Sequence, residues 1–277
     1  MIKCAASLAR DTKPRPVWER RLYGIIGVAF AGTLVTGSAL AADMPMKAPE
    51  APTYQWGGCY LGVNVGGGAS GTNFGSVVDP GTYLAAGDAA TVAGSGGGGA
   101  NADGILAGAQ AGCNFQSGTL VYGLEGDFDY FHTDPQFNNN TNTLANGNAF
   151  AISQSLTTNF LATVRPRIGI AADRNLAYIT GGAAFTSVSY TTSYVDANTP
   201  PGTGTASASR ALVGWTAGAG WEYAWTDHWT VRAEYLLASF PTTNALGTIA
   251  GAGGTNTLHG STDLVIQLVR AGVNFKF

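Results

Sequence analysis

Charged side chains recur at every second position within apolar segments of the chain. Glu125, Asp127 and Asp129 follow one another in this way, and Arg165 and Arg167 repeat the spacing further along. Clustered carboxylates could transfer protons in acid–base catalysis or bind a hard cation. Spacing by two also places side chains on one face of a strand. There, carboxylates and guanidinium groups could neutralise one another inside the protein.

Further charged residues share this face on later segments. The set is nearly balanced, with carboxylates and guanidinium groups at Glu125, Asp127, Asp129, Arg165, Arg167, Glu222, Arg232, Glu234 and Arg270. Gln110 and Asn114 occupy the corresponding alternate positions on an earlier segment. Because buried charges are tolerated only when they are paired, we interpret the set as a structural ion network. Selectivity for a narrow pore, and metal binding or catalysis, are the alternatives.

A glycine-rich stretch at 94–100 contains the spacing G-x-G-x-x-G in Gly94, Gly96 and Gly99. Phosphate binding by such a loop requires a buried strand before it and a helix after it. The pattern of neighbouring residues predicts neither element. We therefore expect a flexible extracellular loop here.

The histidines could act as general bases, but their positions do not favour it. His228 falls at a predicted turn, and His132 and His259 lie in or beside different loops. No serine stands at a fixed spacing from them, as a paired nucleophile would. We predict no enzyme activity, no cofactor and no metal.

The composition indicates export to a membrane. Only 11% of residues are charged, whereas about 25% is usual in soluble domains. Residues 1–41 predict a signal peptide, with a basic start and an apolar run that closes on small residues. Beyond it, 8 Lys and Arg face 15 Asp and Glu, a net charge of −7, which disfavours nucleic acid as a partner. Because no later apolar run reaches 18 residues, a closed β-barrel is the remaining way to span a membrane.

Alternating apolar and polar residues identify the strands that would position the charges. They recur in eight segments, at about 56–67, 104–115, 119–131, 158–170, 175–188, 211–224, 228–239 and 264–277. The connections alternate strictly between short and long, as in outer-membrane barrels with periplasmic turns and extracellular loops. We predict an all-β, eight-stranded antiparallel up-and-down barrel over 56–277, preceded by a Pro-rich periplasmic leader at 42–55.

One parity of these strands is apolar and should face lipid. It comprises Leu61, Val63, Val65, Ile105, Tyr122, Leu124, Phe128, Tyr130, Phe160, Val164, Ile168, Val213, Trp215, Trp221, Tyr223, Trp229, Val231, Tyr235 and Leu237. Rings near strand ends suit the aromatic girdles of a barrel, and these are Trp56, Tyr60, Tyr130, Tyr223, Trp225 and Trp229. Eight strands leave an interior that side chains can fill. Inward glycines such as Gly62 and Gly108 would leave space.

Several stretches resemble the porin-like outer-membrane β-barrel surface proteins of alphaproteobacteria, which are related in architecture to the OmpA barrel. They include "WGGCYLGVNVG", "AGAQAGCNFQ", "YGLEGDFDY", "TVRPRIG" and "VRAGVNFKF". The resemblance implies a location in the cell outer membrane and contact with its lipid. It also implies that Val273, Phe275 and Phe277 form a C-terminal signal for the outer-membrane assembly machinery. Pro166 departs from the family pattern and should disturb the regularity of its strand.

Cys59 and Cys113 are the only cysteines after the predicted signal peptide. Export leads to an oxidising compartment. Both cysteines have the outward parity, at similar heights on neighbouring antiparallel strands. They could therefore form a disulfide, or remain two small apolar residues.

The predicted function is that of an integral outer-membrane barrel with a structural and surface-antigen role and a filled lumen. A small-solute porin is one alternative. Another is a surface receptor or adhesin that binds a ligand through the polar loops 69–103 and 133–157. The sequence does not identify such a ligand.

Overall fold

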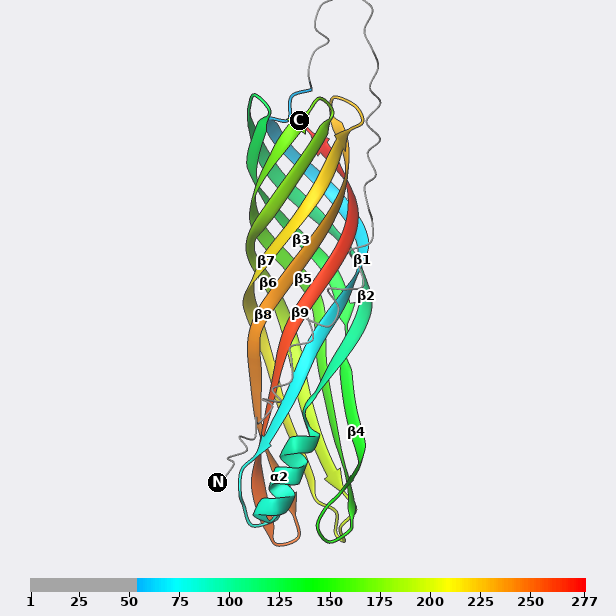
Figure 1. Cartoon of the computed structure of the whole chain (residues 1–277), viewed down its shortest axis with the longest axis vertical. Helices are drawn as coiled ribbons and strands as arrows, with labels where there is room; N and C mark the ends of the chain where they lie inside the picture. Colours follow the sequence, from blue (N-terminus) through cyan, green and yellow to red (C-terminus); the bar gives the residue numbers. More distant parts are fainter. Residues whose placement is uncertain (1–53) are drawn as a thin grey trace, which may run out of the picture. The chain divides into compact units, whose positions relative to one another are not determined.

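The computed structural model describes residues 54–277, which form a long antiparallel barrel (Figure 1). The predicted signal peptide and residues 42–53 of the predicted leader lie outside the described residues. The elements in chain order are β1 (Gly58–Val78), α2 (Ala86–Ser95), β2 (Gly98–Ser117), β3 (Leu120–Thr133), β4 (Gln136–Thr143), β5 (Ala149–Ala172), β6 (Asn175–Asp196), β7 (Thr203–Ala224), β8 (Trp229–Gly251) and β9 (Gly254–Lys276). Within this part of the chain, no helix is long and apolar enough to cross a membrane.

Eight strands close into a ring. β1 pairs with both β2 and β9, and β3 pairs with β5, so the ring contains β1, β2, β3 and β5 to β9. β4 follows β3 after a short interruption and pairs with the outer part of β5. The predicted eight-stranded antiparallel up-and-down barrel is confirmed.

Three of the tight turns lie at the same end of the barrel as the C-terminus (Figure 1). They fall between β2 and β3, β5 and β6, and β7 and β8. Gly118 and Asp173 adopt positive φ angles of 61° and 53° in the first two, a conformation that glycine and aspartate accept most readily in turns. We call this the turn end of the barrel.

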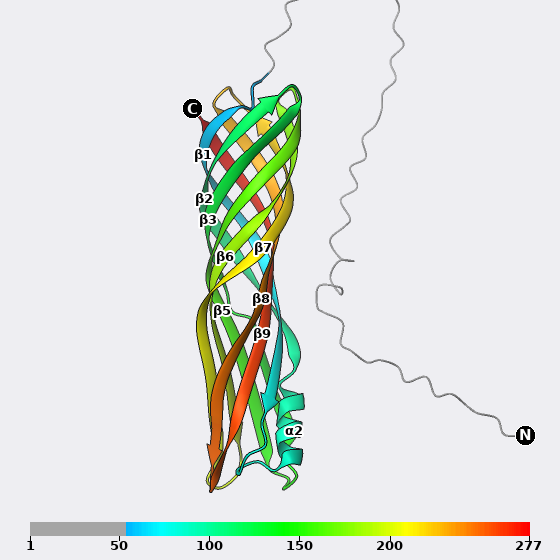
Figure 2. The same cartoon turned by 90° about the vertical axis from the view of Figure 1, so that its left-hand side faces the viewer.

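The strands are much longer than predicted. Six of the eight ring strands have between 21 and 24 residues, whereas about 9–11 residues suffice to cross a membrane. The expected solvated loops at 69–103 and 133–157 are therefore wrong in large part, since much of each is strand and α2 occupies another part of the first. α2 packs at the far end from the turns (Figure 2).

The distribution of polar and apolar side chains between the interior and the exterior is reversed from one end of the barrel to the other. Near the turn end, all the side chains predicted to face lipid are exposed or half-exposed, and the predicted charged set is buried. Further along the strands, the interior is apolar, with residues such as Phe131, Ile152, Tyr190 and Leu258 in one core. We call the part near the turns the membrane half and the remaining strand residues the outer half. The membrane half lies at about 58–67, 105–117, 120–130, 160–172, 175–185, 213–224, 229–237 and 267–276.

The pairing is irregular near the boundary between the halves. Register shifts occur between Tyr130 and Thr133, between Thr158 and Ala162, and between Phe240 and Thr243. Such irregularities redirect side chains and increase local twist. They accompany the change from an apolar to a polar exterior.

Pro166 lies within β5 and is exposed. It pairs with Leu124 of β3, whereas the ladder to β6 is interrupted between Val164 and Arg167. Proline has no N–H to donate to that ladder. The expectation of a continuous strand with a local irregularity is confirmed.

Candidate functional site: the lumen ion network

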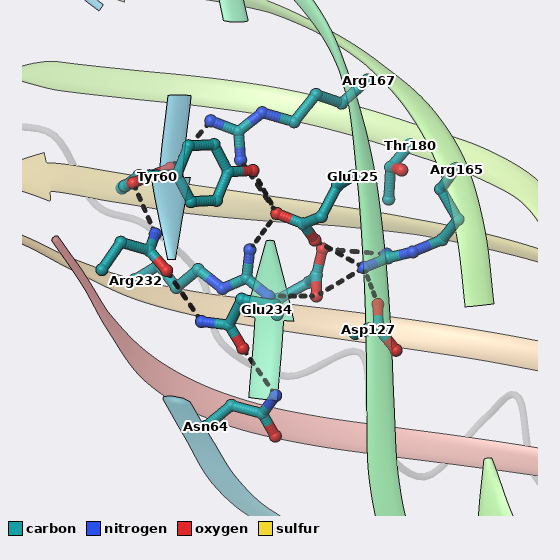
Figure 3. Close-up of polar contacts among 12 residues, drawn as sticks. Tyr60, Asn64, Glu125, Asp127, Arg165, Arg167, Thr180, Arg232 and Glu234 are labelled. Atoms are coloured by element: carbon teal, nitrogen blue, oxygen red, sulfur yellow. Dashed lines mark hydrogen bonds and ion pairs between the residues drawn. The ribbon is translucent and has the colours of Figure 1, made fainter. Parts of the chain in front are cut away.

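Four arginines and five carboxylates lie inside the membrane half, on strands that face one another across the lumen. Figure 3 labels six of them, Glu125, Asp127, Arg165, Arg167, Arg232 and Glu234. β3 supplies Glu125, Asp127 and Asp129, and β5 supplies Arg165 and Arg167. β7 and β8 add Glu222, Arg232 and Glu234, and β9 adds Arg270. Alternation alone brings these side chains to the same face of each strand.

Arg165 is fully buried and connects three carboxylates. One terminal nitrogen, Nη2, lies 2.8 Å from Glu125 Oε1 and 2.8 Å from Asp127 Oδ2. Its other terminal nitrogen, Nη1, lies 3.0 Å from Glu234 Oε1. The guanidinium group therefore joins β3 to β8 across the barrel.

Arg270 makes an equally dense set of contacts. It lies 2.6 Å from Asp129, 3.0 Å from Asp127 and 2.7 Å from Glu234. Arg232 lies 2.5 Å from Glu125 Oε2. In low-dielectric surroundings such contacts are strong only when the charges are fully paired.

The side of the network nearer the turns is completed by Arg167 and neutral groups. Arg167 lies 3.0 Å from Glu222 and 3.4 Å from Glu125, and its Nε donates to Asn114 at 2.9 Å. Asn274 donates to Glu222 at 2.8 Å. The predicted charged residues are thus all brought together, and neutral side chains occupy positions between them.

Two tyrosines belong to the network although the sequence did not identify them. The Tyr60 hydroxyl donates to Glu125 at 2.5 Å and the Tyr178 hydroxyl donates to Glu234 at 3.2 Å. Arg167 lies over both rings, 5.2 and 4.8 Å from their centroids. The assignment of Tyr60 to a lipid-facing girdle is wrong, because its position in the alternation of β1 places it inside with Gly62.

The inward glycines do not leave the lumen empty. A methyl group at Gly112 would lie 2.5 Å from the Tyr60 hydroxyl, and one at Gly220 would lie 2.4 Å from the Tyr178 hydroxyl. At Gly62 it would meet the Asn274 amide oxygen at 2.1 Å. Large side chains from neighbouring strands therefore fill the volume that these glycines release.

An aromatic cluster covers the lumen near the turn end. Trp56 is buried, its ring N–H donates to the Asp173 carbonyl at 3.3 Å, and Tyr54 packs edge-on against it at 4.9 Å. These rings pack with buried apolar residues of the strands, including Leu176. The expectation that Trp56 lies in a lipid-facing girdle is wrong. The last described residues of the predicted leader, together with Trp56 at the predicted start of the barrel, instead form a cap, which we call the Tyr54–Trp56 cap.

The opposite tip is held by hydrogen bonds around Asp196, which is buried. Its carboxylate accepts from the hydroxyls of Tyr83 at 2.6 Å and Tyr194 at 2.8 Å. It also accepts from the backbone N–H groups of Asn198 and Gly202 at 3.0 and 2.9 Å. This carboxylate connects the segment before α2 to the connection between β6 and β7.

The glycine-rich stretch at 94–100 is packed, so the expected flexible loop is wrong. It contains the end of α2 and the start of β2. Gly96 is buried, and its carbonyl accepts a hydrogen bond from the Gln154 side chain. A methyl group at Gly98 would collide with the Phe137 ring at 2.2 Å. Gly96 permits the end of α2 to pack closely against Ser76 of β1, and Gly98 permits β2 to pack closely against Phe137 of β4.

The three histidines have different hydrogen-bond partners in the fold. The His132 ring contacts the Asn159 amide, the His228 ring contacts the Lys276 carbonyl, and the His259 ring contacts the Asp79 carboxylate. Among residues 54–277, no group of three or more His, Cys, Asp or Glu side chains has an arrangement suited to a metal ion.

Cys59 and Cys113 form a disulfide in the structure between directly paired positions of β1 and β2.

Val273, Phe275 and Phe277 follow the outward alternation of β9 and are exposed. The ring of Phe275 packs against that of Trp229, with 5.1 Å between the ring centroids.

A model of the outer membrane protein beta-barrel domain matches residues 34–277. The chain belongs to this family. The 31 kDa outer-membrane immunogenic protein of Brucella melitensis is 29% identical over 267 residues, covering 92% of this chain and all of that protein. The 25 kDa outer-membrane immunogenic protein of Brucella abortus is 27% identical over 250 residues, covering 90% of this chain and 92% of that protein. As a member of this barrel family, the protein is located in the cell outer membrane.

Solved barrels are more distant from this family member. The outer-membrane protease OmpT from Escherichia coli has a TM-score of 0.41 and 9% identity, covering 83% of this chain and all of that one. The outer membrane protein OprG from Pseudomonas aeruginosa has a TM-score of 0.40 and 12% identity, covering 81% and 99%. These scores are too low to support a conclusion about function.

Proposed function

We propose that this outer-membrane barrel is a structural, surface-exposed protein whose lumen does not conduct ions or solutes and which catalyses no reaction. The observation that carries this proposal is the buried ion network, in which four guanidinium groups join strands on opposite sides of the membrane half. The names of the Brucella relatives support a role as a surface antigen.

The interior contents support the closed lumen in three successive layers. The Tyr54–Trp56 cap lies at the turn end, the ion network fills the middle, and the apolar core fills the outer half. A hydrated ion that entered would have to separate paired charges and then cross apolar side chains, and both steps are costly.

Lipid and the outer-membrane assembly machinery are the partners that fit this role. The exposed apolar parity of the membrane half suits acyl chains. We assign Val273, Phe275 and Phe277 to recognition by the assembly machinery, because these exposed side chains lie on one face of β9.

Planar-bilayer recordings test the closed lumen. The purified folded protein should give no steady conductance. The double variant Tyr54→Ala with Trp56→Ala should also remain closed, because the ion network lies behind the cap. Glu125→Ala combined with Arg232→Ala, which removes the contact between β3 and β8, should also remain closed, because the apolar core of the outer half still fills the lumen beyond the network.

Heat-modifiable migration on gels would first establish that each variant is a folded barrel. Stable ohmic steps of one size in most insertions of the unaltered protein would contradict the proposal and favour a small-solute porin. Openings that depend on the cap alone would show that the network is hydrated and conducts.

A further inference from the structure

The Cys59–Cys113 disulfide lies in the lipid-facing surface of the membrane half. Cys113 pairs with Leu124 of β3, which is 56% exposed, and Phe115 occupies the next outward position of β2. Leu61 occupies the next outward position of β1 after Cys59 and is also 56% exposed. The bond is therefore surrounded, on its own face of the sheet, by side chains that suit acyl chains.

This apolar surface continues past the disulfide toward the turn end. Phe115 stacks on Tyr122 of β3, with 5.8 Å between the ring centroids, and the exposed Ile170 of β5 lies nearer still to the turns. On the side of β9, Phe277 is exposed, and its N–H donates to the Cys59 carbonyl at 3.2 Å. Once the barrel is in the membrane, the two sulfur atoms thus lie within the apolar band.

Forming the disulfide requires an oxidant that accepts two electrons. In thiol–disulfide exchange, one protein thiolate attacks the disulfide of a catalyst, which gives a mixed disulfide and releases a catalyst thiol. The second protein thiolate then attacks the mixed disulfide. The protein gains its disulfide, and the catalyst leaves with both of its cysteines reduced. Both attacks need a thiolate, and hydrocarbon does not solvate such a charge.

We infer that this disulfide forms while the chain is still in water, before the barrel enters the membrane, and that its partner in this step is a soluble thiol–disulfide oxidoreductase. Such a catalyst acts in the oxidising compartment through which exported chains pass. The chain then reaches the membrane with Cys59 and Cys113 joined, in the register that β1 and β2 have in the folded barrel. Since β1 also closes the ring against β9, one strand of the closing pair is positioned in advance.

The length of the connection explains why this pair of strands benefits from a covalent link. The two cysteines are 54 positions apart, and the connection between β1 and β2 contains α2. By contrast, β6 and β7 are joined by residues 197–202 alone. Closing a longer loop costs more conformational entropy, and a disulfide formed beforehand removes that cost from the insertion step.

Oxidation of the reduced protein, before and after folding, tests the inference. The full-length reduced protein would be folded into phosphatidylcholine vesicles, checked by heat-modifiable migration, and mixed with an oxidised soluble oxidoreductase that has a Cys-x-x-Cys active site. Alkylation after unfolding would count the remaining thiols. The folded barrel should oxidise about a hundredfold more slowly than the same chain diluted from urea without lipid, because lipid excludes both the catalyst and the thiolate.

A second cysteine pair on the water-exposed wall is the matched control. Ser189 and Ser209 are directly paired and exposed in the outer half, with their hydroxyls 3.1 Å apart. Ser189→Cys with Ser209→Cys would be introduced into a chain that also carries Cys59→Ser and Cys113→Ser. The same catalyst should oxidise this pair in the folded barrel about as fast as in the unfolded chain, since water reaches it in both states.

Pulse-labelled cells give the order of events directly. The exported chain should lose its free thiols before it becomes heat-modifiable, and strains without soluble periplasmic thiol oxidoreductases should accumulate it with both thiols free. Failure of the reduced chain, but not of the oxidised one, to fold in vesicles would also support the inference. Equal oxidation rates of Cys59 and Cys113 in the folded and unfolded protein would overturn it. So would a heat-modifiable barrel with free thiols that appears before the oxidised form, or normal oxidation in the deletion strains.

Discussion

At the scale of single residues, pairing decides whether a charge can lie inside the barrel. Arg165 is fully buried and contacts three carboxylates, whereas Arg174 at the turn end pairs with the largely exposed Asp227. Arg165 lies between Val164 and Pro166 within β5, whereas Arg174 lies between Asp173 and Asn175 in the turn that joins β5 to β6. Their environments differ because the alternation of β5 points the Arg165 side chain into the lumen.

Replacing Arg165 with Leu should lower the free energy of unfolding by roughly 3–5 kcal/mol, because it leaves buried carboxylates without a partner. Arg174→Leu should have little effect, since exposed ion pairs contribute little. Urea titrations of the purified barrels would measure both values. Equal midpoints for Arg165→Leu and the unaltered protein would mean that water reaches the lumen charges.

The Cys59–Cys113 disulfide makes a second prediction at this scale. The folded protein isolated from the outer membrane should resist alkylation until it is unfolded and reduced. Mass spectrometry would then find both cysteines modified together. Equal alkylation of the unfolded protein with and without reductant would show that the thiols are free.

At the scale of elements, the sequence predicted the membrane half well because its alternation combines large apolar residues with charged ones. The outer half was mistaken for loops because its outward residues are small and polar. In β6, for example, Ser189, Thr191 and Ser193 alternate with Tyr190 and Tyr194, and the tyrosines form part of the outer core. Periodicity of this kind is visible only if serine and threonine are accepted as strand residues.

The charged members of the ion network were predictable together, since alternation along each strand places all of them on the inward face. Tyr60 and Tyr178 were not, because their role depends on which strands face each other across the lumen. The same applies to Trp56, which packs under residues that are distant in the sequence.

The outer tip should be sensitive to acid through Asp196. Burial raises the pKa of this carboxyl, but hydrogen bonds from Tyr83, Gly202 and Tyr194 outweigh burial and hold it below its ordinary value. A group with a lowered pKa stabilises the fold above its unfolded pKa, and this stabilisation is lost as the pH falls through the folded value. Proteolysis of the 197–202 connection should therefore increase below about pH 4, near the ordinary pKa of aspartate.

Asp196→Asn is the variant that checks this assignment, because it should show fast cleavage at neutral pH and a weaker dependence on acid. Asp134→Asn, in the short connection between β3 and β4, provides a control at another outer position, where the half-buried carboxylate accepts hydrogen bonds from Gln136 and Thr157. An unchanged acid profile in Asp196→Asn would place the sensitive group elsewhere.

At the scale of the whole molecule, the barrel has two different arrangements of polar and apolar side chains, one for each solvent. The membrane half has an apolar exterior and a charged interior, and the outer half has the opposite arrangement. Each strand crosses the boundary, so that one continuous sheet meets lipid at one level and water at the next. The register shifts in β3, β5 and β8 lie close to this change.

Assembly of the whole barrel should depend on the outward face of β9. Phe277→Lys should leave export intact but sharply reduce the amount of heat-modifiable, protease-protected barrel, because it places a charge on an apolar face that we assign to the assembly machinery. Lys276→Ala, on the opposite parity, is the matched control and should assemble well. Normal assembly of Phe277→Lys would exclude that role for Phe277.

The long outer strands also determine what an antibody can recognise on the cell. A synthetic peptide copying 187–195 would display Tyr190 and Tyr194, yet the folded protein hides these rings, which are 0% and 2% exposed. On the intact surface, Ser189 and Thr191 of β6 lie beside Ser209 and Ser207 of β7, about twenty positions later in the chain. The epitopes of the outer half are therefore conformational and span several strands. Sera raised against linear peptides should bind the denatured protein on a blot and fail to bind living cells.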